Sequence, residues 1–381
     1  MKPVILRQPS PLVIGDGCAP QCAEWLAARG ARRVLLVTST PVWPALVSVM
    51  AALRQAQLDV VQSPPVDAEP TCAFFDLVLA GARARKVDAV LGIGGGSVLD
   101  VAKLAAALLT GPQTLPEVFG QDRLAGRKLL LVCLPTTAGT GSEVSPNAIL
   151  LDETDQVKKA VVSPHLVPDA AFVDPTLTWS VPPDVTAATG LDALTHCLEA
   201  YANKQAHPVV DIYALEGLRL ISASLERAVR QGHDAEARAH LALGSVLGGL
   251  CLGPVNTAAV HALAYPLGGR FRVPHGLANA LLLPHVLRFN VPAAPQRYAA
   301  AALALGAERA GSDLEIARRG VDRIAQLVAA CGLPSGLAAL GVPRDALPEL
   351  ARAAMQVTRL LQNNPRPLTE ADALQIYQAA Y

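Results

Sequence analysis

Several features that would mark a particular class of protein are scarce in this chain. Charged residues make up only 17% of its 381 residues, and 32 basic side chains balance 32 acidic ones. Without a basic excess the chain has no net positive potential to attract nucleic acid or an acidic lipid surface, so neither is expected as a partner. Its 51% content of hydrophobic residues also excludes an intrinsically disordered chain.

The cysteines give no sign of a disulfide framework. There are seven, an odd number, and none falls in a doubled C-x-x-C pattern, so a zinc ribbon is not expected either. The first residues include Lys2, Arg7 and several prolines, in place of the apolar stretch of a signal peptide. The most apolar window, 241–252, is shorter than the roughly 20 residues that span a bilayer. We therefore expect a cytoplasmic protein with no membrane segment.

The chain length favours two domains, and the two halves differ in pattern. The first half alternates apolar runs with alanine-rich helical stretches, which predicts strands at 33–38, 87–92, 129–134 and 171–174 in a parallel sheet. After Asp174 the spacing is helical, with breaks expected at Pro254, Pro266, Pro274, Pro292 and Pro334. We predict an α/β domain over 1–181 and an all-helical domain over 182–381.

A glycine-rich loop follows the predicted strand 87–92. Gly94, Gly95, Gly96 and Ser97 lead into a helix. Bare glycines let backbone N–H groups approach a pyrophosphate, and the helix N-terminus adds the positive end of its dipole. A tight turn that needs positive φ explains the same triplet. Because Ser97 replaces the third glycine of the dinucleotide fingerprint, the motif alone does not choose between the two.

The strand 129–134 leads into a second candidate ligand loop. Residues 135–143 read PTTAGTGSE, and their hydroxyls and exposed amides can donate to phosphate, ribose or carboxamide groups. Open α/β sheets bind ligands at the carboxyl ends of their strands. An ordinary helix cap of Thr or Ser is the alternative, and the glycine loop upstream favours contact with a ligand.

Four side chains of the helical half form a candidate metal site. Asp192 and His196 are four residues apart and share one helix face, His261 lies in an apolar helical segment, and His275 lies at a loop-to-helix turn. A buried, unpaired imidazole costs roughly a few kcal/mol, which coordination would offset. Any one of these histidines is explained by a hydrogen-bonded core position. Together they form a set that suits Fe²⁺ or Zn²⁺ and leaves a position open for a substrate oxygen.

Four segments resemble the iron-containing (group III) alcohol dehydrogenase family over nearly the whole chain. They are GIGGGSVLDVAK at 92–103, PTTAGTGSEVS at 135–145, GLDALTHCLEAY at 190–201 and the stretch 260–286. The resemblance implies a dehydroquinate synthase-like architecture: a nucleotide-binding α/β domain, an all-helical domain and an active-site cleft between them. It also implies reduction of aldehydes or ketones, or oxidation of alcohols, with NAD or NADP.

Matched position by position, the resemblance assigns roles to single residues. The family's metal ligands fall on the same four residues that the spacing selects. Its pyrophosphate loop falls on Gly95, Gly96 and Ser97, with Asp100 beside it. Its nucleotide and nicotinamide contacts fall on Thr136, Thr137, Thr140, Ser145 and Lys158, and a substrate contact is expected at Asn147.

Two positions depart from the family pattern. Many members carry an aspartate after the strand at 33–38 that holds the adenosine ribose and repels a 2′-phosphate, and here that position is Ser39. Loss of the carboxylate makes NADP admissible. Four residues beyond His261, members often show a second histidine in the proton path, and here it is Tyr265. A phenol can relay a proton, but with an ordinary pKa of about 10 it is no base near neutral pH.

The sequence thus predicts a metal-dependent, NAD(P)-linked alcohol dehydrogenase or carbonyl reductase for small aliphatic substrates, assembled as a homodimer or larger. Related alternatives are a polyol (glycerol-type) dehydrogenase, a dehydroquinate synthase-like lyase, and a maleylacetate reductase-like enzyme, against which the intact ligand positions argue. In a different class, the chain is a non-catalytic nucleotide-binding protein with a structural metal. A structural site is closed by protein ligands, whereas a catalytic site keeps an open position.

Overall fold

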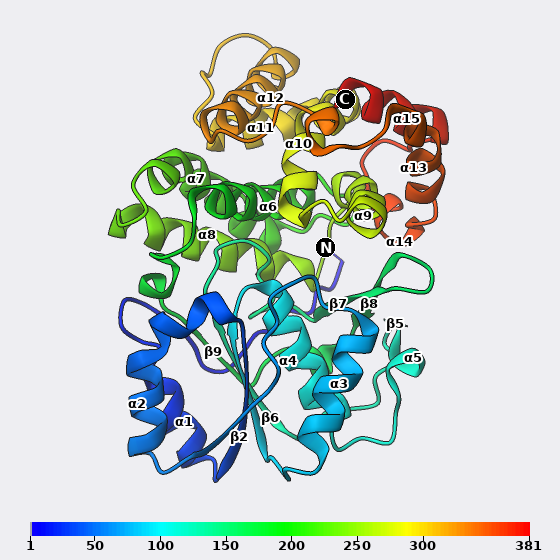
Figure 1. Ribbon diagram of the computed structural model, residues 1–381. Coiled ribbons are helices and arrows are strands. Elements are labelled where there is room, and N and C mark those ends of the chain that lie inside the picture. Colours follow the sequence, from blue (N-terminus) through cyan, green and yellow to red (C-terminus); the bar gives the residue numbers. More distant parts are fainter. Residues whose placement is uncertain (1) are drawn as a thin grey trace. The chain divides into compact units, whose positions relative to one another are not determined.

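The computed structural model describes residues 2–381, which form two compact units (Figure 1). The α/β unit comprises residues 6–137 and 141–180. The helical unit comprises the residues up to Ile5, the segment 138–140 and residues 181–381. The predicted fold class, a parallel sheet with helices followed by a helical part, is confirmed.

The main sheet of the α/β unit has six strands in the order β1-β9-β6-β4-β2-β3, and all neighbouring pairs are parallel. The strands are β1 (Leu12–Ile14), β2 (Arg33–Thr38), β3 (Asp59–Gln62), β4 (Ala89–Gly94), β6 (Leu130–Pro135) and β9 (Ala170–Val173). The four predicted strands correspond to β2, β4, β6 and β9. The two edge strands, β1 and β3, were not predicted because each is short and only partly buried.

Helices cover both faces of this sheet, which explains why its central strands are apolar at successive positions. Side chains of a strand alternate between the faces. Leu36 of β2 therefore packs in the core beneath α1 (Gln21–Ala28) and α2 (Val47–Gln55), while Leu35 packs in the core beneath α3 (Cys72–Arg83) and α4 (Gly96–Leu108). Because all pairs of this sheet are parallel, the carboxyl ends of its strands lie at one edge.

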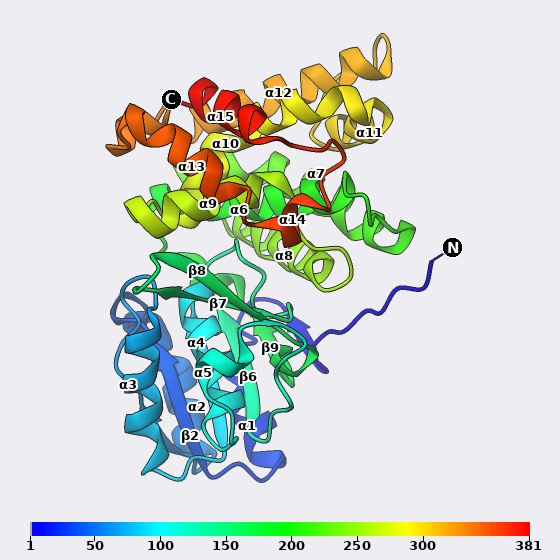
Figure 2. The same ribbon diagram turned by 90° about the vertical axis from the view of Figure 1, so that its right-hand side faces the viewer.

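A second, three-stranded sheet lies within the α/β unit and was not predicted. It consists of β5 (Gly120–Gln121), β8 (Val157–Val162) and β7 (Asn147–Asp152), with a short helix α5 (Leu115–Val118) before it. Figure 2 shows β7 and β8 as an antiparallel pair. The adjacent charges Lys158 and Lys159 obscure the alternation of β8 in the sequence. In chain order, this pair directly follows the loop after β6.

The helical unit contains ten α-helices over the described residues. They are α6 (Pro183–Tyr201), α7 (Pro208–Arg230), α8 (Ala235–Leu252), α9 (Ala259–Phe271), α10 (His275–Asn290), α11 (Pro295–Ala304), α12 (Asp313–Ala330), α13 (Leu347–Ala354), α14 (Thr358–Leu361) and α15 (Glu370–Ala379). One hydrophobic core joins them. The long helix α6 is buried along the whole of its second half.

Prolines begin several of these helices, but one expected break is wrong. Pro183 and Pro208 occupy the first helical turn, where their missing N–H is not needed, and Pro274 caps α10. Pro266, by contrast, lies inside α9, because the packing of that buried helix outweighs the lost hydrogen bond. No helix of the described residues combines the length and apolarity that a membrane crossing requires.

Candidate metal centre and nucleotide-binding edge

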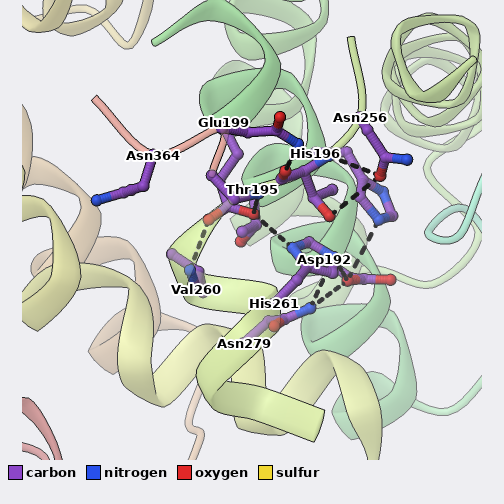
Figure 3. A network of polar contacts seen from close by, with 12 residues as sticks. Asp192, Thr195, His196, Glu199, Asn256, Val260, His261, Asn279 and Asn364 are labelled. Atoms are coloured by element: carbon purple, nitrogen blue, oxygen red, sulfur yellow. Dashed lines mark hydrogen bonds and ion pairs between the residues drawn. The ribbon is translucent and has the colours of Figure 1, made fainter. Parts of the chain in front are cut away.

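Three helices of the helical unit deliver the four candidate metal ligands. Asp192 and His196 lie one turn apart on α6, His261 is the third residue of α9, and His275 is the first residue of α10. Figure 3 shows Asp192, His196 and His261 close to one another on their helices. The candidate site is therefore built entirely within one unit.

The imidazoles converge on one carboxylate oxygen. The distance from Nε2 to Asp192 Oδ1 is 3.8 Å for His196, 3.5 Å for His261 and 3.7 Å for His275. Ligand atoms of Asp192, His261 and His275 all lie within 4.8 Å of one another. The ring of His196 stacks on that of His261, with 4.7 Å between their centroids. Three of the four residues thus form one compact set, and Nε2 of His196 faces the same Asp192 oxygen as the other two imidazoles.

These spacings fit a divalent ion. Two ligand atoms bound to a tetrahedral ion at its usual bond lengths lie about 3.4 Å apart, close to the separations above. The side-chain amide of Asn279 points to the same conclusion. Its Nδ2 lies 2.7 Å from Asp192 Oδ1, 3.2 Å from His261 Nε2 and 3.3 Å from His275 Nε2. An NH₂ group has two hydrogens for these three acceptors, whereas one cation would satisfy all of them.

Burial and charge prepare the carboxylate for this role. Asp192 is 1% exposed, which by itself would raise its pKa, but the facing imidazoles outweigh burial and hold the pKa well below the usual range. The side chains of His196 and His261 are nearly as buried, and that of His275 is 23% exposed. Asp192 is therefore an anion in a buried setting that calls for a positive partner.

The opposite ring nitrogens of two histidines are held by acceptors. His196 Nδ1 lies 3.2 Å from the carbonyl oxygen of Gly139, and His261 Nδ1 lies 2.6 Å from Glu199 Oε2. Because these oxygens accept, each Nδ1 carries a proton, which leaves Nε2 as the nitrogen that a metal would bind. Glu199 and Asn279 are not among the residues predicted from the sequence. Helical spacing offered a signal, since Glu199 is three residues after His196 and Asn279 is four after His275.

A glycine allows α10 to approach α6 closely enough to complete the set. A Cβ on Gly276 would lie 2.4 Å from the carbonyl oxygen of Ala188, so only glycine fits beside the α6 backbone. His275 precedes it and is thereby held against Asp192. Tyr265 of α9 is partly buried, and its ring centroid lies 5.9 Å from that of His275.

The glycine loop of the α/β unit forms a strand-to-helix connection. Strand β4 ends at Gly94, Gly95 is the N-cap, and α4 begins at Gly96. None of these three glycines has a positive φ, so the turn itself does not require them. A Cβ on Gly94 would instead lie 2.5 Å from Val98 Cγ2, which means that close packing excludes a side chain there. The N-terminus of a 13-residue helix thus follows directly from the strand end.

Three predicted cofactor segments lie side by side at the carboxyl edge of the sheet. Gly94 pairs with Pro135, and the N–H of Thr136 donates to the carbonyl of Gly94 at 3.0 Å. An ideal Cβ on Gly95 would lie 3.4 Å from the Thr137 side chain. Ser39 directly follows β2, the neighbour of β4. Ser39, the loop through Ser97 and Thr136–Thr137 therefore follow three adjacent strands.

Other predicted cofactor residues are engaged in internal bonds. The Asp100 carboxylate accepts from Ser142 Oγ at 2.6 Å and from the N–H of Ile149 at 2.9 Å. Lys158 is buried and forms an ion pair with Glu69 at 2.8 Å. Ser145 is buried, while Asn147 begins β7 with its Oδ1 buried and without a hydrogen-bond partner. Thr140 belongs to the segment that clusters with the helical unit.

The loop after β6 is held by a buried lysine, which is not among the site residues predicted from the sequence. Lys103 of α4 is fully buried, and its Nζ donates to the carbonyls of Ser142 at 2.9 Å and Ser145 at 2.8 Å. It also donates to Ser142 Oγ and to the carbonyl of Asn147. The ammonium thereby fixes the path of residues 142–147 against α4. The i+3 spacing of Lys103 from Asp100 was the available signal.

Comparisons with known proteins agree across the whole chain. Residues 9–175 match the model of the family described as "Iron-containing alcohol dehydrogenase", and residues 186–381 match "Fe-containing alcohol dehydrogenase family, C-terminal". The chain is 41% identical over 378 residues to long-chain-alcohol dehydrogenase 1 of Geobacillus thermodenitrificans, covering 97% of this chain and 94% of that protein. It is 32% identical over 375 residues to the NAD-dependent methanol dehydrogenase of Bacillus methanolicus, covering 98% of each.

A solved structure gives the same result for the fold. The crystal structure of a 1,3-propanediol oxidoreductase superposes with a TM-score of 0.96 at 33% identity and covers 100% of both chains. The similarity therefore extends to both units and leaves no part of the chain without a counterpart.

Proposed function

The chain belongs to the iron-containing alcohol dehydrogenase family, as its motifs predict, and from this premise we propose that it interconverts small aliphatic alcohols and their carbonyl compounds at a divalent metal with NAD. It is an oxidoreductase that acts on the CH–OH group. The observation that carries the metal part is the convergence of three imidazole Nε2 atoms on Asp192 Oδ1.

The chain's own residues provide binding, orientation and a proton site. Asp192, His196, His261 and His275 would hold the ion, and the loops after β2, β4 and β6 would hold the dinucleotide. When bound, the ion supplies Lewis-acid stabilisation of the substrate oxygen, and the nicotinamide supplies or accepts the hydride. Oxidation of an alcohol transfers one hydride and releases one proton. Tyr265 would relay this proton, a role supported by the 5.9 Å between its ring centroid and that of His275.

Either Fe²⁺ or Zn²⁺ suits a set of three imidazoles and one carboxylate, and availability decides between them. The test of the metal centre replaces one ligand. We expect His261→Ala, prepared in either metal, to lose bound metal and nearly all turnover. His285→Ala is a matched control because it removes an imidazole from α10 that takes no part in the set. Metal analysis and initial rates measure both effects, and an active, metal-free His261→Ala protein would refute the assignment.

The choice of nucleotide depends on a carboxylate that the sequence did not reveal. Ser39 removes the aspartate that often excludes NADP. However, the carboxylate of Asp67 lies beside Thr40, the residue that follows Ser39. Its Oδ1 and Oδ2 accept from the N–H and Oγ1 of Thr40 at 2.7 and 2.6 Å. The segment after β3 continues along β2, with the N–H of Val66 donating to the Thr38 carbonyl at 2.9 Å. A negative charge beside the predicted ribose site disfavours a 2′-phosphate, which supports NAD over NADP.

Substitution of this carboxylate tests the choice. We expect Asp67→Asn to raise kcat/KM for NADPH relative to NADH by about tenfold, the equivalent of roughly 1.4 kcal/mol. Asp59→Asn is the control, because Asp59 lies at the opposite, amino end of β3. An unchanged NADPH-to-NADH ratio would show that Asp67 does not face the ribose. A panel of alcohols, diols and aldehydes, assayed with both nucleotides, then separates a simple alcohol substrate from a polyol.

A further inference from the structure

We propose that Glu199 is a positioning residue of the metal centre, whose carboxylate fixes the Nδ1-protonated tautomer of His261 and thereby reserves Nε2 for the metal. This inference rests on the metal site of the proposed function. Glu199 lies on α6 with its side chain 5% exposed, and it has no place among the predicted ligands.

The surroundings of the carboxylate consist of donors. Oε2 accepts from the N–H of Ala258 at 3.0 Å and lies 2.6 Å from His261 Nδ1, while Oε1 accepts from the N–H of Val260 at 2.6 Å. The two backbone groups can only donate, so they hold the oxygens as acceptors. The imidazole must therefore supply the hydrogen, because an unprotonated Nδ1 would place its lone pair against a carboxylate.

The two ring nitrogens of His261 thus each face a carboxylate of the same helix, α6. Asp192 and Glu199 are seven residues apart, which places them two turns apart on the same face of α6. Asp192 Oδ1 lies 3.5 Å from Nε2, and Glu199 Oε2 lies 2.6 Å from Nδ1 (Figure 3). The ring orientation and the tautomer are fixed together, which leaves the Nε2 lone pair directed at the candidate ion.

The contrast with His196 shows why this bond matters most. His196 Nδ1 meets a neutral carbonyl at 3.2 Å, whereas His261 Nδ1 meets a carboxylate at 2.6 Å. Hydrogen bonds to an ionised acceptor are shorter and stronger, and a carboxylate behind a metal-binding imidazole raises its basicity. A role limited to capping α9 would involve the two backbone N–H groups and would not need the imidazole.

The isosteric variant Glu199→Gln separates these roles. An amide has one acceptor oxygen, but the site presents donors to both positions. If the oxygen faces Val260, the NH₂ group faces His261 Nδ1 and favours the tautomer with its proton on Nε2, where the metal binds. If the oxygen faces His261, the NH₂ group opposes the N–H of Val260. Either arrangement costs metal affinity.

The experiment measures metal binding and its spectrum, independently of turnover. Metal-free wild type and Glu199→Gln are titrated with Zn²⁺ and Co²⁺ against a chromophoric chelator, and the visible absorption of the Co²⁺ forms is recorded. We expect the dissociation constant to rise by about 10–100-fold and the Co²⁺ spectrum to change. Glu315→Gln is the matched control, because Glu315 also accepts a backbone N–H at a helix start, from Ser312 at 2.7 Å, but lies on α12 away from the centre.

Two outcomes are decisive against the inference. If Glu199→Gln binds both metals with wild-type affinity and spectrum and only melts earlier without metal, Glu199 is a helix cap and nothing more. If instead the wild type itself binds no metal, the proposed function fails first. Should the variant not fold, ¹⁵N-histidine NMR of the Zn²⁺-loaded wild type still tests the tautomer. A His261 signal with a proton on Nδ1 supports the inference, and metal bound through Nδ1 overturns it.

Discussion

Glu143 is a buried acid in the loop after β6, and its environment makes the stability of the α/β unit depend on pH. The residue is 2% exposed. Burial raises its pKa from 4.5 to about 7, against the smaller opposing effects of a backbone hydrogen bond and the Lys103 ammonium. The folded chain therefore keeps a proton on Glu143 at pH values where the unfolded chain has released it.

The sign of the effect follows from this difference in bound protons. Between pH 4.5 and about 7 the unfolded state binds fewer protons at this site, so the free energy of unfolding falls as pH rises and levels off above about 7. The full contribution is roughly 3 kcal/mol. Urea denaturation at pH 5, 6, 7 and 8 should show this decline in the wild type and a flatter profile in Glu143→Gln. Parallel profiles would show that Glu143 ionises normally.

At the same scale, the ligand types were readable from the sequence and their partners were not. Asp192 and His196 share a helix face, and histidines in apolar segments need a partner, so four candidate ligands could be selected without coordinates. Glu199 and Asn279 escaped notice because a buried glutamate or asparagine acquires meaning only through the group that it faces. Glu199 faces His261, and Asn279 faces Asp192 and His261, so the decisive partners come from other helices.

Among the elements, the central strands were predictable because burial on both faces leaves an unbroken apolar run. The β7–β8 pair was not, since its residues are partly exposed and include Lys158 and Lys159. The break expected at Pro266 was wrong because a local rule was overridden by the packing of α9. The sequence pattern thus identified strands that are buried throughout and missed strands that combine buried and exposed residues.

Helix α4 and the loop 142–147 are joined by one ammonium group, which suggests a test of how the loop is held. Burial lowers the pKa of Lys103, with the charge of Asp100 opposing it. In Lys103→Met the carbonyls of Ser142, Ser145 and Asn147 lose this donor, and each buried acceptor without a partner costs about 1–3 kcal/mol. We expect a loss of several kcal/mol in the free energy of unfolding.

The same variant should weaken nucleotide binding, because the loop after β6 carries predicted nicotinamide contacts. We expect the dissociation constant for NADH, measured by fluorescence titration of metal-free protein, to rise about tenfold. Lys128→Met is the control, because Lys128 is an exposed lysine of the same unit. A stability loss without any change in NADH affinity would mean that Lys103 supports the fold but not the cofactor loop.

At the scale of the whole molecule, the two units have separate hydrophobic cores. One core comprises residues of α6 to α15 together with Ala138, which clusters with that unit, while two others line the two faces of the main sheet. The candidate metal ligands all belong to the helical unit, and the predicted nucleotide loops belong almost entirely to the α/β unit. Each ligand should therefore stabilise a different part of the chain.

The placement of tryptophan allows this to be measured directly. All three tryptophans, Trp25, Trp43 and Trp179, lie in the α/β unit, so their emission reports its unfolding, while far-ultraviolet circular dichroism at helical wavelengths is dominated by the helical unit. A ligand at 100 times its dissociation constant stabilises the state that binds it by about 2.7 kcal/mol, which shifts the midpoint of a domain of this size by roughly 5–11 °C. We expect Zn²⁺ to raise the dichroism midpoint and NADH to raise the fluorescence midpoint. If either ligand shifts both signals equally, the two units unfold as one cooperative body and their separate cores do not make them independent.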